Sequence, residues 1–156
     1  MSARDAGLRS LITVLLLGVL ACGDDTPLPV SDDGKLVLAA EASPASTNVG
    51  QSFTVEVTLT NRTAATVSLP SSDGCRLGFE VRTASGAPVV APRYVCIGPI
   101  DSLALVPGAV VRESYGYQPG TTGFPRLEAG RYQLLPSVVV RDPSDVLIRT
   151  GTLQVR

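Results

Sequence analysis

The 156-residue sequence contains no histidine and no tryptophan, and it has a single lysine, Lys35. Without histidine the chain cannot build a Ser-His-Asp or Cys-His nucleophile, and it lacks the commonest zinc ligand. Charged residues make up 17% and hydrophobic residues 44%, so a folded domain is expected rather than disorder. The formal net charge of −1 gives no electrostatic basis for binding nucleic acid.

Motifs for catalysis and cofactor binding are missing as well. The sequence has no Gly-x-Ser-x-Gly, no P-loop, no Gly-x-Gly-x-x-Gly and no EF-hand loop. We expect its five glutamates to be mostly solvated surface on outward strand faces or in turns: Glu41, Glu56, Glu80, Glu113 and Glu128. A hydrolytic carboxylate pair stays open as a third alternative, because separation in space decides it. The leading expectation is a protein that is not an enzyme and binds no metal or cofactor.

Residues 1–21 are typical of a secretory signal peptide. Arg4 and Arg9 precede an apolar run from Leu11 to Leu20, and the small residue Ala21 follows before a break. Ten helical residues rise about 15 Å, which is half of a hydrocarbon core of about 30 Å and too short for a permanent span. The sequence therefore predicts export and removal of residues 1–21.

Val19-Leu20-Ala21-Cys22 resembles the lipobox of bacterial lipoproteins, in which the cysteine is acylated, with palmitate for example, and becomes the mature N-terminus. The resemblance implies that Cys22 anchors the chain in a lipid bilayer of the cell envelope, facing the periplasm or the exterior. Several acyl chains at about 0.8 kcal/mol per buried methylene give a stable anchor. Residues 22–34 are rich in Asp and Pro and are predicted to form a flexible tether.

From residue 35 onward the hydrophobic pattern has a period of two. Phe53–Leu59 and Leu77–Val81 alternate apolar and polar residues, which is typical of half-buried strands. Other β-rich runs, separated by Gly, Pro, Asn and Asp turn signals, are 35–40, 66–69, 88–96, 109–117, 131–140 and 145–155. Seven to eight short strands predict an all-β, immunoglobulin-like antiparallel β-sandwich over residues 35–156.

Leu127-Glu128-Ala129-Gly130-Arg131-Tyr132 resembles the tyrosine corner of Greek-key sandwiches, with Tyr132 as the corner residue. Together with Phe53–Asn61, Cys75–Gly86 and Leu105–Gly108, this segment resembles the bacterial BsuPI-type immunoglobulin-like domains, named after an intracellular proteinase inhibitor of Bacillus. The resemblance covers about residues 36–156. It implies an immunoglobulin-like fold and raises the hypothesis of proteinase inhibition.

Cys75 and Cys96 remain once Cys22 is assigned to lipid. A cysteine pair in an exported domain predicts a disulfide, with free buried thiols as the alternative. The Ser85-Gly86 turn lies midway between the two cysteines. Two strands folded about that turn would bring Cys75 and Cys96 opposite each other, within reach of a bridge.

Three of the seven aromatic residues lie in the Gly/Pro-rich segment 115–126. Exposed aromatics and arginine are typical of binding surfaces, so a candidate binding loop comprises Tyr115, Tyr117, Phe124 and Arg126. The alternative, which we favour, is that the rings cover the end of the sandwich. The triplet Asn61-Arg62-Thr63 also has two interpretations. It matches a glycosylation sequon, but it is typical of a hairpin turn.

The leading hypothesis is a non-catalytic, lipid-anchored envelope protein that acts by protein contact or as a structural part. Its expected partners are the lipid bilayer, through Cys22, and an unidentified envelope protein. The alternative is a proteinase inhibitor whose exposed, rigid loop, Gln118–Arg126, inserts into protease subsites. The sequence does not separate these roles by itself, because one fold serves many functions.

Overall fold

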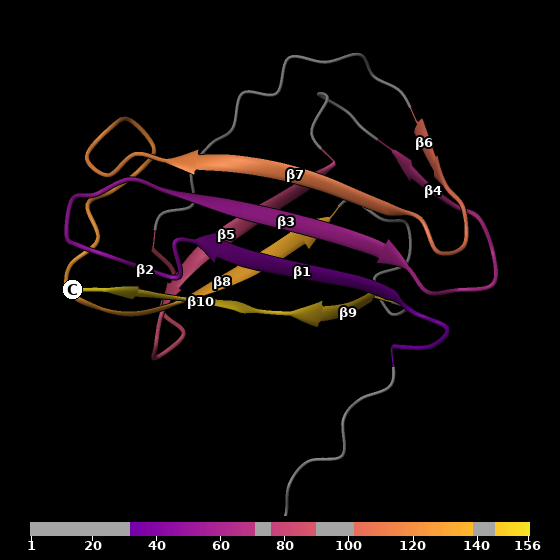
Figure 1. The fold of residues 1–156 in the computed structure, drawn as a ribbon, viewed down its shortest axis with the longest axis horizontal. Helices are drawn as coiled ribbons and strands as arrows, with labels where there is room; N and C mark the ends of the chain where they lie inside the picture. Colours follow the sequence, from indigo (N-terminus) through magenta and orange to yellow (C-terminus); the bar gives the residue numbers. More distant parts are fainter. Residues whose placement is uncertain (1–31, 71–75, 90–101, 139–145) are drawn as a thin grey trace, which may run out of the picture. The chain divides into compact units, whose positions relative to one another are not determined.

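The computed structural model describes residues 32–70, 76–89, 102–138 and 146–156, and within these ranges every regular element is a β-strand. Residues 31–156 form one compact unit (Figure 1). The strands are β1 (Leu36–Ser43), β2 (Ser46–Thr47), β3 (Phe53–Asn61), β4 (Val67–Pro70), β5 (Leu77–Thr83), β6 (Ser102–Leu105), β7 (Val110–Tyr117), β8 (Gly130–Val138), β9 (Val146–Arg149) and β10 (Gly151–Val155).

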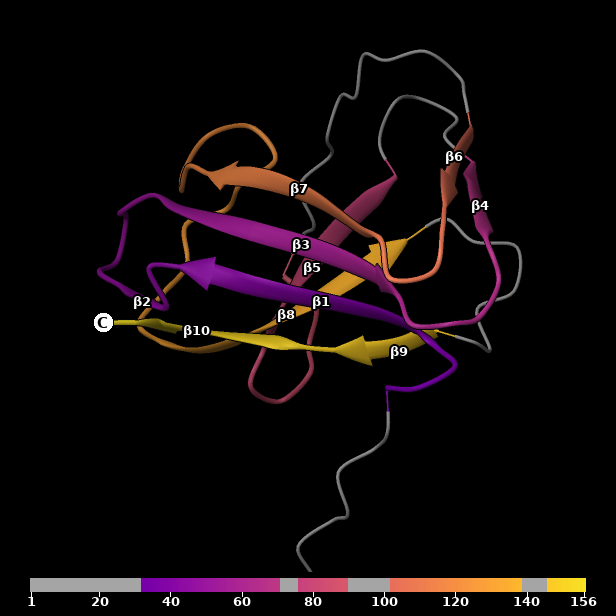
Figure 2. The same cartoon turned by 45° about the vertical axis from the view of Figure 1, so that its right-hand side comes forward.

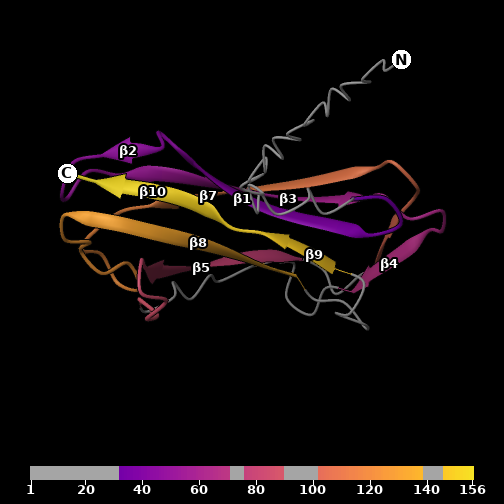
Figure 3. The same ribbon diagram turned by 90° about the horizontal axis from the view of Figure 1, so that it is seen from below.

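Eight of these strands form two facing sheets, which Figure 3 shows as two layers. One sheet has the order β7-β3-β1-β9, and the other has the order β2-β10-β8-β5. The core between them is built from alternate residues of each strand. On β3, for example, Phe53, Val55 and Val57 are buried, whereas Thr54 and Glu56 are exposed. The predicted all-β sandwich is confirmed.

Most neighbouring strands are antiparallel, as predicted, but two strand pairs are parallel. β9 pairs parallel with β1, and β10 pairs parallel with β2. The predicted single strand 145–155 is divided, because β9 belongs to the first sheet and β10 to the second. A Cβ atom added at Gly151 would overlap the carbonyl oxygen of Ala40 on β1. The chain thus changes sheets at a position that has room only for glycine.

β4 and β6 form a small third sheet beside the sandwich (Figure 2). Leu69 and Leu105 from these strands are buried in the main core. The sequence pattern did not predict β6. Its four residues are too short to show a reliable period, and two of them are exposed.

Asn61 fastens this small sheet to the end of β3. Its side chain is fully buried, and its amide nitrogen donates to the carbonyls of Leu105 and Ala65 at 2.8 Å each. Its amide oxygen accepts from the backbone N–H and the hydroxyl of Thr63. The sequon asparagine is therefore a structural residue of the turn, and its amide nitrogen is not accessible in the folded domain.

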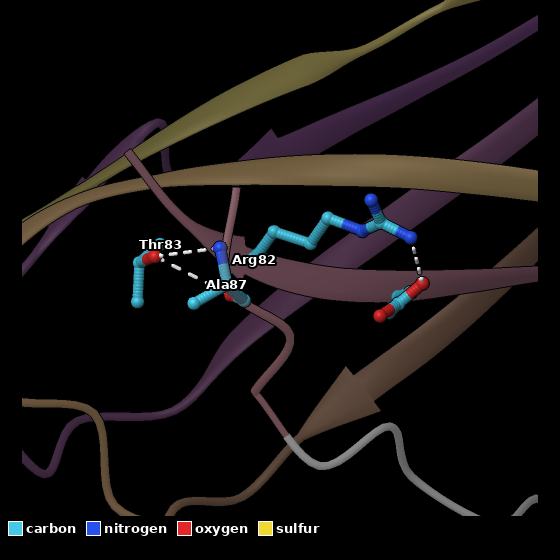
Figure 4. A network of polar contacts seen from close by, with 4 residues as sticks. Arg82, Thr83 and Ala87 are labelled. Atoms are coloured by element: carbon cyan, nitrogen blue, oxygen red, sulfur yellow. Dashed lines mark hydrogen bonds and ion pairs between the residues drawn. The ribbon is translucent and has the colours of Figure 1, made fainter. Parts of the chain in front are cut away.

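The turn predicted at Ser85-Gly86 is present after β5. The Thr83 N–H donates to the Ala87 carbonyl at 2.9 Å, and the Thr83 hydroxyl and the Ala87 N–H add a second contact (Figure 4). Arg82 lies opposite Pro88 in the returning segment and also pairs with Glu80 at 3.0 Å (Figure 4). This register differs by one residue from the one that would place Cys75 directly opposite Cys96. Both cysteines lie outside the described residues.

Asp32 and Gly34, which the sequence analysis placed in the tether, form a turn against the domain. The Gly34 N–H donates to the Arg62 carbonyl at 3.0 Å, and the Asp32 carboxylate pairs with Arg149 of β9. The chain therefore joins the sandwich at the end where β1 starts and β3 finishes, since Leu36 lies opposite Asn61.

Candidate functional site

The loops at the opposite end of the sandwich contain the predicted binding segment. At this end Ser43 of β1 lies opposite Thr54 of β3, which lies opposite Gly116 of β7. We call the segments 44–52 and 118–129, which connect strands here, the loop end. In Figures 1 and 2 it lies on the left, beside the C-terminus. Residues 32–34 join the sandwich at the other end of the same strands, which we call the tether end.

The β7–β8 loop is folded back on itself by backbone hydrogen bonds. The Gly120 N–H donates to the Phe124 carbonyl at 2.8 Å, and the Phe124 N–H donates to the Thr121 carbonyl at 2.9 Å. Gly120 and Gly123 have positive φ angles of 84° and 87°, which suit glycine in tight turns. These bonds make this part of the loop a folded-back turn.

Tyr117 is a core residue and is therefore wrong as a candidate binding aromatic. Its exposed fraction is 0%, its ring stacks on Phe53 at 4.6 Å, and Phe124 meets it edge-on at 4.9 Å. The Tyr117 hydroxyl donates to the Pro125 carbonyl at 2.8 Å. Burial, with a smaller contribution from Tyr132, raises the pKa of Tyr117 to about 12. The alternative that we favoured, in which the aromatic rings cover the end of the sandwich, therefore applies to Tyr117.

Tyr115 points between the sheets as well, next to an inward-facing carboxylate. The Tyr115 hydroxyl donates to the Leu77 carbonyl and to Glu113. The Glu113 carboxylate accepts from the backbone N–H groups of Arg76 and Leu77 at 3.4 and 3.3 Å. Glu113 is thus not the surface residue that the sequence suggested. It joins β7 to the start of β5 across the sandwich.

Arg126 is the member of the predicted loop that is exposed. Its guanidinium group lies against Gly50 of the β2–β3 connection, while Phe124 is partly buried on the core. Val49, next to Gly50, is partly buried on the core as well. The Arg126 side chain therefore lies between the two segments of the loop end, 44–52 and 118–129.

Tyr132 lies at the start of β8, where the motif predicted a corner. Its side chain is mostly buried, and its hydroxyl donates to the carbonyl of Glu128, four residues earlier, at 2.9 Å. This is the upstream backbone bond that defines a tyrosine corner. It fixes the end of the β7–β8 loop where the chain enters the sheet.

Cys22, Cys75 and Cys96 lie outside the described residues, so the lipid attachment and the disulfide remain predictions. Within the described residues, no helix is long and apolar enough to cross a bilayer. The same part of the chain contains no cluster of three or more Cys, Asp or Glu side chains that could hold a metal ion.

No family model matches the sequence, and no curated protein matches it. Among solved structures, the chain is similar to the CARDB domain of a Pyrococcus furiosus protein in complex with di-metal ions. The identity is 15% and the TM-score 0.42, over 78% of this chain and 94% of that one.

Two longer proteins show similarities of the same order. An alkylpurine DNA glycosylase from Pseudomonas fluorescens has 12% identity and a TM-score of 0.47, over 79% of this chain and 31% of that one. A β-glucosidase from Erythrobacter marinus has 14% identity and a TM-score of 0.44, over 78% of this chain and 16% of that one. These similarities carry no statement about binding or activity.

The strand pairing of the chain defines its class. β1, β3 and β7 share one sheet and β5, β8 and β10 share the other, as strands A, B, E and C, F, G do in immunoglobulin folds. Tyr132 occupies the corner position at the start of the F-type strand, β8. The chain therefore contains an immunoglobulin-like β-sandwich domain.

Proposed function

We propose that this protein is a lipid-anchored component of a bacterial cell envelope and acts without catalysis by contacting another protein. The sequence supports the anchor through the signal-like residues 1–21 and the lipobox-like segment ending at Cys22. The lack of histidine supports a non-catalytic role, because it removes the common nucleophile and zinc chemistry.

The observation that carries the proposal is the position of the loop end relative to the point where the tether joins. The Gly34 N–H donates to the Arg62 carbonyl beyond the end where β1 starts, and Asp32 pairs with Arg149 of the neighbouring strand β9. β1 has eight residues and spans about 26 Å at roughly 3.3 Å per residue. A chain anchored upstream of Asp32 would therefore hold its loop end away from the attachment point, where a partner can reach it.

The proteinase-inhibitor alternative depends on an exposed loop that can enter protease subsites. Residues 118–126 fold back through the bond between Gly120 and Phe124, and the Phe124 ring packs on Tyr117. This geometry favours a contact surface made by the whole loop end over a single inserted strand.

The anchor is tested by replacing Cys22 with serine in the full-length chain. The wild-type protein is expected to carry acyl mass and to fractionate with membranes. Cys22→Ser is expected to lose both properties, because serine offers no thiol for acylation. Cys75→Ser makes the same chemical change elsewhere and is expected to keep the lipid. Acylated Cys22→Ser protein would refute the anchor.

Protein contact is tested by photo-crosslinking from Thr122, an exposed residue of the loop end, in cells that express the full chain. Thr66, which is exposed at the tether end, is the matched position. A discrete crosslinked protein from Thr122 and none from Thr66 is the expected result. Equal labelling from both positions would contradict a contact role for the loop end.

A further inference from the structure

Three arginines lie in or next to the loop end. Arg126 lies against Gly50, and the neighbouring Val49 N–H donates to the Arg156 carbonyl at 2.9 Å. Arg131, the second residue of β8, lies opposite Gln154 of β10, two residues before Arg156. The backbone contacts therefore bring Arg126, Arg131 and Arg156 to the same end of the domain, although up to 30 positions separate them in the sequence. We call them the loop-end arginines.

The sheet register also sets the direction and spacing of two of these side chains. Tyr132 and Val155 are buried, so Arg131 and Gln154 face outward from the second sheet. The Arg156 N–H donates to the Thr47 carbonyl, which continues the β10 ladder and places Arg156 on the same outer face as Gln154. Side chains on such a diagonal of neighbouring strands lie about 7–8 Å apart.

Among the described residues, no carboxylate side chain lies within ion-pair distance of the loop-end arginines. All three residues are exposed, and within the described part of the chain none of their guanidinium groups has an ion pair or a hydrogen bond. Other arginines do have such partners: Arg82 pairs with Glu80, and Arg149 pairs with Asp32. Unbalanced guanidinium groups at one end favour an anionic partner there.

The surroundings of the loop-end arginines suit a protein segment. Phe124 and Val49 are partly buried beside Arg126, and Pro119 and Pro125 are partly exposed in the same loop. Arginine beside apolar side chains is the typical composition of protein interfaces. Residues on one side of an extended peptide repeat every 6.6–6.8 Å or so, which approaches the diagonal spacing of Arg131 and Arg156.

We infer that the loop-end arginines bind an extended, acidic segment of the partner protein, in which carboxylates occupy alternate positions. The inference rests on the proposed function and names the chemistry of its partner. Each guanidinium group would hold one carboxylate through paired N–H···O bonds, and the apolar side chains beside Arg126 would contact the backbone and the methylene groups of the same acidic residues.

The test uses the full-length chain in a neutral detergent and a fluorescent peptide of alternating Asp and Ser, followed by fluorescence anisotropy. Arg126→Gln, Arg131→Gln and Arg156→Gln are each expected to raise Kd by about tenfold, since each loses a charge-assisted pair. Arg62→Gln removes the same charge from an exposed residue at the tether end and is expected to leave Kd unchanged. The affinity is expected to fall as salt is added.

Three outcomes would overturn the inference. The first is that Arg62→Gln weakens binding as much as the loop-end variants do, and the second is that a peptide of alternating Lys and Ser binds equally well. The third is that a uronate polysaccharide or polyphosphate binds more tightly than the acidic peptide at equal charge. Failure of the proposed function is separate, because it is judged by the acylation of Cys22 and by crosslinking from Thr122. A crosslinked partner without peptide binding would refute only the acidic segment.

Discussion

Tyr117 shows how a residue predicted for a binding loop belongs to the core. Its position in a Gly/Pro-rich stretch left exposure and burial open, with burial favoured. It is the last residue of β7, and strand alternation points it inward. A period-two pattern shows which face of the sheet a residue occupies only when the end of its strand is known. Arg126 differs because no strand determines its direction, and it stays exposed.

The phenol of Tyr117 predicts a stability change in alkaline solution. Its pKa is about 12 in the folded chain and 10.0 when the phenol is solvated. The fold thus favours the neutral phenol, so the resulting stability is complete below pH 10 and is lost as the pH rises through 12. Urea unfolding should show a free energy of unfolding that falls over this interval, and Tyr117→Phe should flatten the fall.

Tyr132→Phe provides the control for this pH dependence. It removes the hydroxyl bond to Glu128 and should lower the free energy of unfolding by about 1 kcal/mol at neutral pH. Most of the alkaline decrease that belongs to Tyr117 should persist in this variant, because burial is the larger cause of its raised pKa and Tyr132 the smaller one. A Tyr117→Phe protein with the same alkaline decrease as the wild type would show that another group is responsible.

At the scale of the elements, period-two alternation predicted β3 and β5 well, because each has one face in the core and one in solvent. It gave no information on the pairing partner of each strand. The division between β9 and β10 was missed, since β-forming residues run from Val146 to Val155 and only Gly151 interrupts them at the change of sheets. Glu113 was missed for a related reason: alternation gives its face, but only the neighbouring backbone of Leu77 makes an inward carboxylate favourable.

We predict that replacing Gly151 with alanine lowers the stability of the domain strongly. In Gly151→Ala the new methyl group would overlap the Ala40 carbonyl, and a backbone atom cannot rotate away. Strands β1 and β10 would have to separate, so the free energy of unfolding should fall by about 3 kcal/mol or more. Gly116→Ala is the control, because no atom lies within 4 Å of the added methyl group. A chemical denaturation midpoint equal for both variants would contradict this account.

For the molecule as a whole, the sequence also predicts a bridge between Cys75 and Cys96. Closing a loop of 22 residues should stabilise the domain by roughly 3 kcal/mol in the chain-entropy model. Comparison of oxidised and reduced protein by denaturation, with mass spectrometry to count thiols, checks this value. Two free thiols in protein isolated from an oxidising compartment would contradict the bridge.

The register after β5 sharpens this expectation. Arg82 lies opposite Pro88, and an unbroken ladder from this point would not place the two cysteines directly opposite each other. A bridge would therefore need one extra residue in one of the two strands, as in a β-bulge. The sequence alone could not show this, because the midpoint of a turn does not determine its hydrogen-bond register.

The pairing of β1 with β9 has a consequence for how the chain folds. β1 is the first strand and lies between β3 and β9, so its sheet is complete only when residues near Arg149 are available. Pairing between distant parts of a chain makes folding slow, often milliseconds to seconds in β-sandwiches. Export, as proposed above, would benefit from this order. Synthesis runs from β1 to β10, but the first sheet closes only with the next-to-last strand, so the chain would stay unfolded until β9 is available.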